Sequence, residues 1–152
     1  MPILSMLSPE RVLQNIEGGS KKRIIEFFSK IIAESDDDLT AEAVFSGLIG
    51  RERLGSTGIG EGVAIPHCRL AGLQKAIGAL ICLSEPINFD AIDNRPVDLL
   101  FFLLVPEEAC DEHLSTLGTL AEVFSQNEAR EKLRNTHSTE ELLQVATQLF
   151  RT

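Results

Sequence analysis

Val97-Asp-Leu-Leu-Phe-Phe-Leu-Leu-Val105 is the stretch of this sequence that decides the fold class. A second apolar run, Ala76-Ile-Gly-Ala-Leu-Ile-Cys-Leu83, comes shortly before it. In each run both alternating faces are largely apolar, which is typical of strands covered on both sides by helices. Neither run approaches the roughly 20 apolar residues of a membrane-spanning helix. We therefore expect an α/β fold, a three-layer sandwich with a small mixed β-sheet flanked by helices on both faces.

Helix signals lie on both sides of these two runs. Apolar residues recur at helical spacing in residues 24–32, where Phe27 belongs to the expected stripe, and in residues 41–49. Residues 12–16 can form an early strand or a turn, whereas the Pro, Asp and Asn content of residues 85–96 predicts a loop. Five polar residues stand where a helix N-cap is expected: Ser20, Thr40, Asp111, Asn127 and Ser138.

The chain is acidic and of single-domain size. Its 152 residues predict one domain that spans residues 1–152. The formal net charge of -9 argues against nucleic acid as a partner, because the phosphates would be repelled. The three scattered cysteines form no C-x-x-C pair, and the first residues lack the basic start and long apolar stretch of a signal peptide. We expect a cytoplasmic protein with no membrane insertion.

Two histidines are the centre of the candidate site. His67 follows the strand-like segment Val63-Ala-Ile and Pro66, and the proline is expected to end strand pairing just before the imidazole. His113 falls in the first turn of a predicted helix, on the apolar face of that helix. A neutral imidazole is a good phosphoryl acceptor near pH 7. The pair therefore predicts a phosphohistidine site.

Four side chains in or near a glycine-rich segment are expected to assist His67. A guanidinium and two hydroxyls could balance the negative charge of a phosphoryl group. A carboxylate could orient the imidazole by accepting the proton of one ring nitrogen. These side chains are, in that order, Arg51, Ser56, Thr57 and Glu61.

The residues alone leave other interpretations open. A single histidine at a strand end is commonly a structural residue. His67, His113, Glu61 and Cys68 could hold zinc, although no H-x-E, H-E-x-x-H or paired-cysteine spacing is present. Cys68 could be a thiol nucleophile, but no local motif places a base beside it. The glycine-rich segment matches neither a P-loop nor the dinucleotide fingerprint.

One long segment resembles a known active site. Arg51-Glu52, followed by Gly55-Ser-Thr-Gly-Ile-Gly-Glu-Gly-Val-Ala-Ile-Pro-His67, is similar to the active-site segment of enzyme IIA domains of the bacterial phosphotransferase system, in the fructose/mannitol superfamily. The resemblance extends over nearly the whole chain, through Phe89-Asp-Ala-Ile-Asp-Asn-Arg-Pro-Val-Asp-Leu-Leu-Phe101 and His113-Leu114. Gly-Ser-Thr-Gly-Ile-Gly and Phe-Asp-Ala-Ile-Asp-Asn resemble the nitrogen-regulatory branch in particular.

The resemblance implies a reaction and a set of roles. His67 falls on the phosphorylated position, His113 on the second active-site histidine that helps hold the phosphoryl group, and Arg51 and Glu61 on further active-site positions. The donor would be a histidine-containing phosphocarrier protein, with phosphoenolpyruvate as the ultimate source. No metal and no organic cofactor is implied. The output would be regulatory, through target proteins such as sensor kinases or transporters that respond to the phosphorylation state.

Two departures from the family pattern bear on these expectations. Cys68 stands where the family often has glycine, so a larger side chain could narrow partner approach or add redox sensitivity. Glu61 stands where the nitrogen-regulatory branch often has asparagine, and in this respect the sequence is more similar to sugar-specific members. The alternatives are a sugar-specific enzyme IIA that passes phosphate to an enzyme IIB, a metal-dependent hydrolase, and a binding module without transfer activity.

Overall fold

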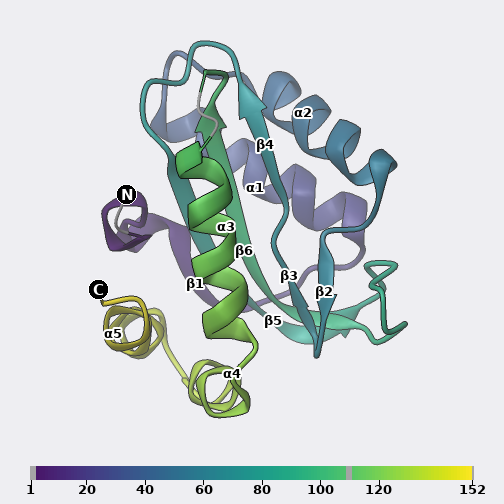
Figure 1. Cartoon of the computed structure of the whole chain (residues 1–152), viewed down its shortest axis with the longest axis vertical. Helices are drawn as coiled ribbons and strands as arrows, with labels where there is room; N and C mark the ends of the chain where they lie inside the picture. The colour runs from purple at the N-terminus through teal and green to yellow at the C-terminus, as the bar shows by residue number, and fades with distance from the viewer. Residues whose placement is uncertain (1–2, 109–110, 152) are drawn as a thin grey trace.

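The structure, a computed structural model, describes residues 3–108 and 111–151, without the side chains of Asp111 and Glu112 (Figure 1). Two short 3-10 helices lead into a first strand and two helices, and three helices close the chain. The elements in order are η1 (Ile3–Met6), η2 (Pro9–Arg11), β1 (Val12–Ile16), α1 (Lys21–Ser35), α2 (Ala41–Leu54), β2 (Gly58–Gly60), β3 (Val63–Ala64), β4 (His67–Leu70), β5 (Ile77–Ile87), β6 (Val97–Pro106), α3 (Asp111–Phe124), α4 (Asn127–Arg134) and α5 (Thr139–Leu149).

The six strands form one mixed sheet around the two apolar runs. The strand order is β1-β5-β6-β3-β2, and β4 also pairs with β6. β5 and β6 are antiparallel, whereas β1 runs parallel to β5, and β3 and β4 run parallel to β6. The early strand at residues 12–16 is confirmed as β1.

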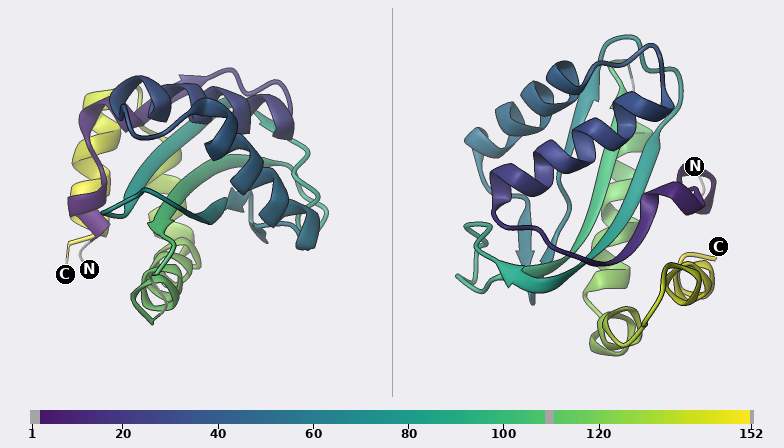
Figure 2. Two further views of the ribbon diagram at one scale, coloured as in Figure 1. Left: turned by 90° about the horizontal axis from the view of Figure 1, so that it is seen from above. Right: turned by 180° about the vertical axis from the view of Figure 1, so that it is seen from behind.

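The sheet separates two hydrophobic cores, which makes the molecule a three-layer sandwich. Helices α1 and α2 cover one face and α3 crosses the other (Figures 1 and 2). Because adjacent strand residues point to opposite faces, β6 supplies both cores. The ring of Phe102 stacks on Phe28 at a centroid distance of 4.2 Å. Phe101 meets Phe124 and Phe150 edge-on on the other side. The predicted fold class is confirmed.

Three of the five expected helix caps are confirmed, and one is wrong. Each confirmed residue accepts a hydrogen bond from the backbone N–H three positions on: Ser20, Thr40 and Ser138. Asn127 is instead the first residue of α4, with Gln126 before it. The Asn127 side chain contacts Arg130 and Glu131 within the helix instead of capping it. The cap expected at Asp111 falls on a side chain outside the described ones.

Two further expectations from the sequence are wrong. Strand β5 continues to Ile87, so the loop expected from residue 85 begins later. Pro86 is tolerated there because the pairing of β5 with β6 shifts between Cys82 and Ile87, which relieves the need for its missing N–H. Phe27 is 37% exposed, because Ile25 and its neighbours already form the buried face of α1.

Among residues 3–108 and 111–151, no helix has both the length and the apolar character needed to cross a membrane.

Candidate functional site

His67 is the first residue of strand β4, and it stands on one continuous line of pairing with β6. Ala64 of β3 pairs with Leu100 and His67 pairs with Leu103, so the register is the same on both sides of the proline. The Pro66 carbonyl accepts from the N–H of Leu103 at 2.9 Å. Strand β3 does end before Pro66, as expected, but pairing with β6 resumes at His67 in the same register. The proline lacks a donor, but its carbonyl, which faces β6, is enough to keep the alignment.

The fold brings His113 to His67. His113 lies in the first turn of α3, and the two ring centroids are 5.4 Å apart at an interplanar angle of 52°. The His113 side chain is buried, and its Nδ1 has no hydrogen-bond partner among the described residues. The fold therefore places a second imidazole, with one buried nitrogen unpartnered among the described residues, next to the ring of His67.

The orientation of His67 is set by a backbone carbonyl. Nδ1 of His67 lies 2.7 Å from the Ile65 carbonyl oxygen. Because a carbonyl only accepts, this contact places the ring proton on Nδ1 and leaves a lone pair on Nε2. Burial is the main cause that lowers the pKa of His67 below 6.5, and the charge of Arg51 lowers it further, whereas Ile65 and Glu52 oppose these effects. The neutral ring is the form that can act as a nucleophile.

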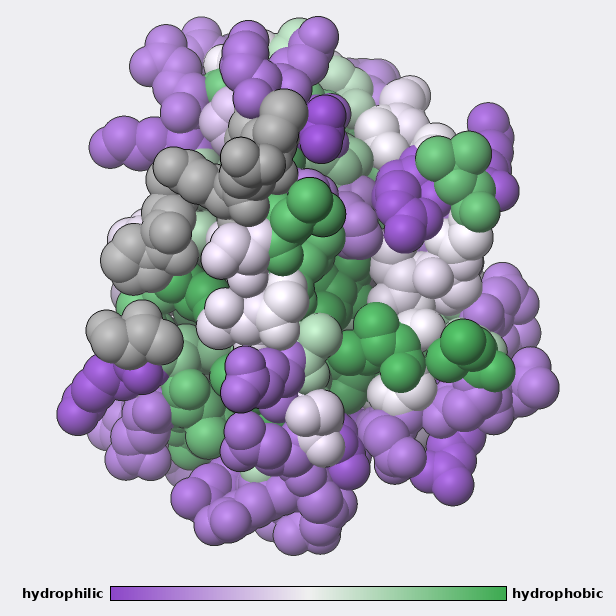
Figure 3. All heavy atoms as spheres, viewed as in Figure 1, coloured by the Kyte–Doolittle hydropathy of each residue, from purple (hydrophilic) through white to green (hydrophobic). Residues whose placement is uncertain are grey.

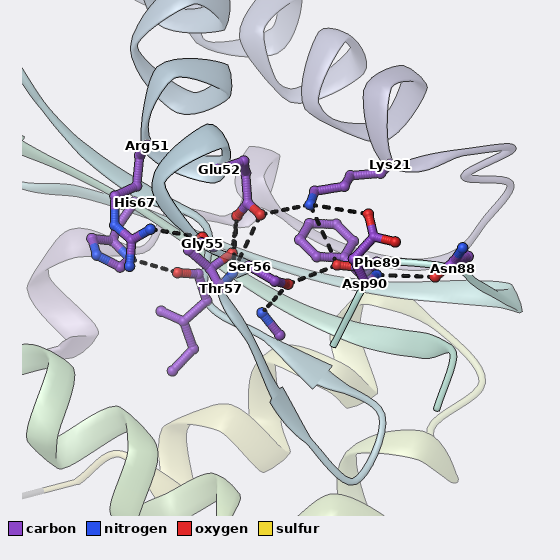
Figure 4. Close-up of polar contacts among 12 residues, drawn as sticks. Lys21, Arg51, Glu52, Gly55, Ser56, Thr57, His67, Asn88, Phe89 and Asp90 are labelled. Carbon is purple, nitrogen blue, oxygen red and sulfur yellow. Dashed lines mark hydrogen bonds and ion pairs between the residues drawn. The ribbon is translucent and has the colours of Figure 1, made fainter. Parts of the chain in front are cut away.

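Arg51 comes from the last turn of α2 and lies beside His67. Its Nη1 donates to the Gly55 carbonyl at 2.8 Å, which satisfies a backbone group at the C-terminus of the helix. Figure 4 shows the guanidinium next to the imidazole of His67. The inward direction expected for Arg51 agrees with this position. A fixed positive charge at this point can balance charge that develops on a ligand held by His67.

The hydroxyls of Ser56 and Thr57 are occupied by protein groups, contrary to the expected role in binding phosphate. Ser56 Oγ donates to the Phe89 carbonyl at 2.7 Å and accepts from the Gly58 N–H at 3.0 Å. Thr57 is 4% exposed, and its hydroxyl donates to the Glu52 carboxylate. A buried hydroxyl needs a partner, and here the protein supplies it. These residues hold the segment before β2 in place (Figure 4).

Glu52 and Lys21 form a buried ion pair that the sequence reasoning did not assign. Lys21 Nζ lies 2.8 Å from Glu52 Oε2, and the Glu52 side chain is 4% exposed. Glu52 lies one helical turn after Leu48, on the apolar stripe of α2. An acidic residue at such a position is the feature of the sequence that could have predicted a buried ion pair. Lys21 opens α1, where the helix dipole disfavours a cation, which also indicates a specific partner.

Glu61 is not placed to orient His67. It lies in the turn between β2 and β3, with a φ angle of 57°. Its carboxylate is 3.2 Å from Arg95 Nη1 and 3.8 Å from Arg130 Nη2, so it ties this turn to α4. The Ile65 carbonyl takes the orienting role instead. In the described part of the chain, no three His, Cys, Asp or Glu side chains form a group that could hold a metal ion.

Cys68 faces the core and not the site. It alternates with His67 along β4, and its side chain packs in the core shared with α2, close enough to Gly47 that a Cβ there would lie 2.9 Å from the sulfur. Burial raises the pKa of the Cys68 thiol to about 12. The geometry therefore gives Cys68 no part in partner approach and no reactive thiolate.

Comparison with known proteins places this geometry in a family. A family model for the phosphoenolpyruvate-dependent sugar phosphotransferase system, EIIA 2, matches residues 5–148. A nitrogen regulatory protein of Pseudomonas aeruginosa is 46% identical over 92% of this chain and 91% of its own length, and that of Escherichia coli K12 is 41% identical over 97% and 90%. The crystal structure of nitrogen regulatory protein IIA-Ntr from Neisseria meningitidis is 46% identical, with a TM-score of 0.88 over 94% of this chain and 97% of its own. The chain therefore belongs to the enzyme IIA type 2 family of the phosphotransferase system, and within it to the nitrogen-regulatory branch.

Proposed function

We propose that this protein is a cytoplasmic phosphocarrier that accepts a phosphoryl group on Nε2 of His67. The observation that carries the proposal is the contact of Nδ1 with the Ile65 carbonyl at 2.7 Å, because it leaves Nε2 with the lone pair that attacks phosphorus. The lowered pKa of His67 keeps the ring neutral near pH 7. The nitrogen-regulatory relatives favour a regulatory role in preference to a purely metabolic one.

The phosphoryl group passes in line from the imidazole of the donor to the imidazole of His67. The bond from the donor's phosphohistidine nitrogen to phosphorus breaks, and its electron pair returns to the donor ring. The lone pair of His67 Nε2 forms the new nitrogen–phosphorus bond. The proton on Nδ1 remains hydrogen-bonded to the Ile65 carbonyl, which balances the positive charge that develops on the ring. The guanidinium of Arg51 and the imidazole of His113 stabilise the equatorial oxygens.

The surface around the site suits a protein donor. Four large apolar side chains, in α2, in β2, between β5 and β6, and in α3, are exposed: Leu54, Ile59, Ile92 and Leu114. Figure 3 shows green patches over these elements on the face that carries α3. Apolar groups of this kind around a polar centre are the usual composition of a transient docking surface. We propose that a histidine-containing phosphocarrier protein docks here.

Phosphorylation would alter which partners bind this surface. A phosphoryl group adds up to about two negative charges. On a chain of net charge -9, this addition repels acidic partners and attracts basic ones. Regulatory targets, such as sensor kinases or transporters, would thus distinguish the two states.

The test is incubation with phosphoenolpyruvate and the two upstream proteins of the phosphotransferase system. We expect one acid-labile, alkali-stable phosphoryl group that is absent from His67→Ala. His113→Ala should slow transfer and leave the fold intact. His137→Ala is the matched control, because His137 is exposed in the connection between α4 and α5. Full labelling of His67→Ala would refute the assignment.

A second assay separates the regulatory role from the sugar-specific alternative. The phosphorylated protein is mixed with purified enzyme IIB proteins. Rapid discharge by one of them would show a sugar-specific enzyme IIA, whereas a stable phosphorylated form supports the regulatory proposal. Stoichiometric zinc in an elemental analysis would favour the hydrolase.

A further inference from the structure

A chain of hydrogen bonds links the buried carboxylate of Glu52 to the imidazole of His67. Lys21 Nζ holds one carboxylate oxygen at 2.8 Å. The N–H of Thr57 lies 3.3 Å from each oxygen, and the Thr57 hydroxyl donates to the same group. The N–H of Ile65 donates to the Thr57 carbonyl at 3.0 Å. The Ile65 carbonyl then accepts from Nδ1 of His67 (Figure 4).

The ion pair between Lys21 of α1 and Glu52 of α2 is a costly way to hold two helices together. Two charges lose their hydration on burial, and apolar side chains of similar volume often stabilise a fold as well or better. Val44 and Leu48, on the same stripe of α2, are fully apolar neighbours along the helix. A charge at Glu52 is thus poorly explained by core packing. It is well explained by the need to fix a polar segment in one conformation.

That conformation sets the direction of the Ile65 carbonyl. The short stretch between β3 and β4 is fastened at two points, by Thr57 on the N–H of Ile65 and by Leu103 on the carbonyl of Pro66. If Thr57 moved, the peptide between Ile65 and Pro66 could rotate. The proton of His67 would then lose its acceptor, and the ring could adopt the other tautomer.

We propose that Glu52, held by Lys21, is a positioning residue that acts through Thr57 and Ile65 to keep Nε2 of His67 ready for phosphoryl transfer. This inference rests on the proposed function, because it assigns a role toward the acceptor nitrogen. Glu52 does not touch the reacting atoms. Its effect is to select the tautomer and the direction of the ring.

Lys21 extends the same restraint to the connection between β5 and β6. Its Nζ donates to the Phe89 carbonyl at 3.4 Å, lies 4.9 Å from the centroid of the Phe89 ring, and reaches Asp90 at 3.7 Å. Ser56 donates to the same Phe89 carbonyl at 2.7 Å. The segment before β2 is therefore held by Glu52 on one side and by the Phe89 carbonyl on the other. Lys21 contacts both groups, so removal of its ammonium group should loosen both contacts.

The test compares Glu52→Gln and Lys21→Met with Lys21→Arg and a matched control, Asp98→Asn. Asp98 also belongs to a partly buried ion pair, with Arg134 at 3.0 Å, but that pair joins β6 to α4. One readout is the tautomer of neutral His67, measured by nitrogen-15 NMR on the unphosphorylated protein. The other is the single-turnover rate of phosphorylation as a function of donor concentration, and thermal melting monitors folding.

We expect the Nδ1–H tautomer in the wild type and in Asp98→Asn, and a substantial Nε2–H population in Glu52→Gln and Lys21→Met. The maximal rate of these two should fall roughly tenfold or more, since a displacement of about 1 Å can cost about a hundredfold. The half-saturating donor concentration should not change, because the apolar docking surface is intact. Lys21→Arg should restore most of the rate.

The inference is overturned if Glu52→Gln and Lys21→Met both keep the wild-type tautomer and the wild-type maximal rate. In that case their only change would be a lower melting temperature, as in Asp98→Asn. Should either variant fail to fold, Thr57→Val, which removes the hydroxyl contact with Glu52, is measured by the same two readouts. If the wild type is not labelled on His67, the proposed function fails, and the tautomer comparison still decides whether Glu52 positions the ring.

Discussion

Gly58→Ala should separate the two segments that meet beside the site. A Cβ at residue 58 would lie 2.7 Å from the Cβ of Ala91 and 3.0 Å from its Cα. Non-bonded carbons are normally about 3.5–4.0 Å apart. The start of β2 and the connection between β5 and β6 would therefore have to move apart by about 1 Å. The hydrogen bond from Ser56 to the Phe89 carbonyl lies in this contact and would lengthen.

The expected cost has two parts. Overpacking of this kind costs about 1–3 kcal/mol of the free energy of unfolding, which leaves a typical domain of about 5–15 kcal/mol largely folded. A displacement of about 1 Å near the acceptor should slow phosphoryl transfer by roughly tenfold to a hundredfold. Urea denaturation measures the first part. Single-turnover labelling from the phosphorylated donor measures the second.

Gly50→Ala is the matched control, because among the described residues no atom outside its own helical turn lies within 4 Å of a Cβ at residue 50. Alanine in the helix should raise the free energy of unfolding by up to about 1 kcal/mol and leave the labelling rate unchanged. The reasoning is refuted if Gly58→Ala matches Gly50→Ala in both the stability and the rate.

Two further predictions follow from the pKa shifts. The pKa values of His67 and His113 are both lowered from 6.5, mainly by burial, so the unfolded chain binds more protons than the folded one just below pH 6.5. The free energy of unfolding should therefore decrease as the pH falls below about 6.5, and a flat profile from urea titrations between pH 7.5 and about 5 would contradict this linkage. Burial raises the pKa values of the Cys68 and Cys82 thiols to about 12. In the variant Cys110→Ser, a thiol reagent should therefore label neither cysteine before urea is added. Rapid labelling of the native protein would contradict this prediction, because it would show an accessible thiolate.

The sequence predicted the layers of the fold because that information is local. Strands that are apolar on both faces need helices on both sides, and β6 shows this directly through Phe101 and Phe102. The confirmed caps at Ser20, Thr40 and Ser138 are equally local, because each residue binds a backbone group three positions along. Strand β5 was harder to delimit, since Pro86 normally indicates a break and only its place at a register shift makes it tolerable.

For the candidate site, too, the sequence predicted some features and missed others. An imidazole next to a proline and a glycine-rich segment indicated His67 as a candidate nucleophile, and the predicted pairing with His113 is supported by a ring distance of 5.4 Å. The role expected of Glu61 was wrong, although it is close to His67 in sequence. The turn between β2 and β3 reverses the chain and carries Glu61 to Arg95 and Arg130.

By itself the sequence determined which side chains could do chemistry and which faces of the helices and strands had to be buried. Both depend on residue type and on spacing along a few turns or strands. Only the tertiary structure decided which polar groups were already satisfied by the protein. The hydroxyls of Ser56 and Thr57 and the carboxylate of Glu52 are held by partners that come from other elements. A buried polar group takes whatever partner the fold brings within hydrogen-bond distance, and no local pattern states which partner that is.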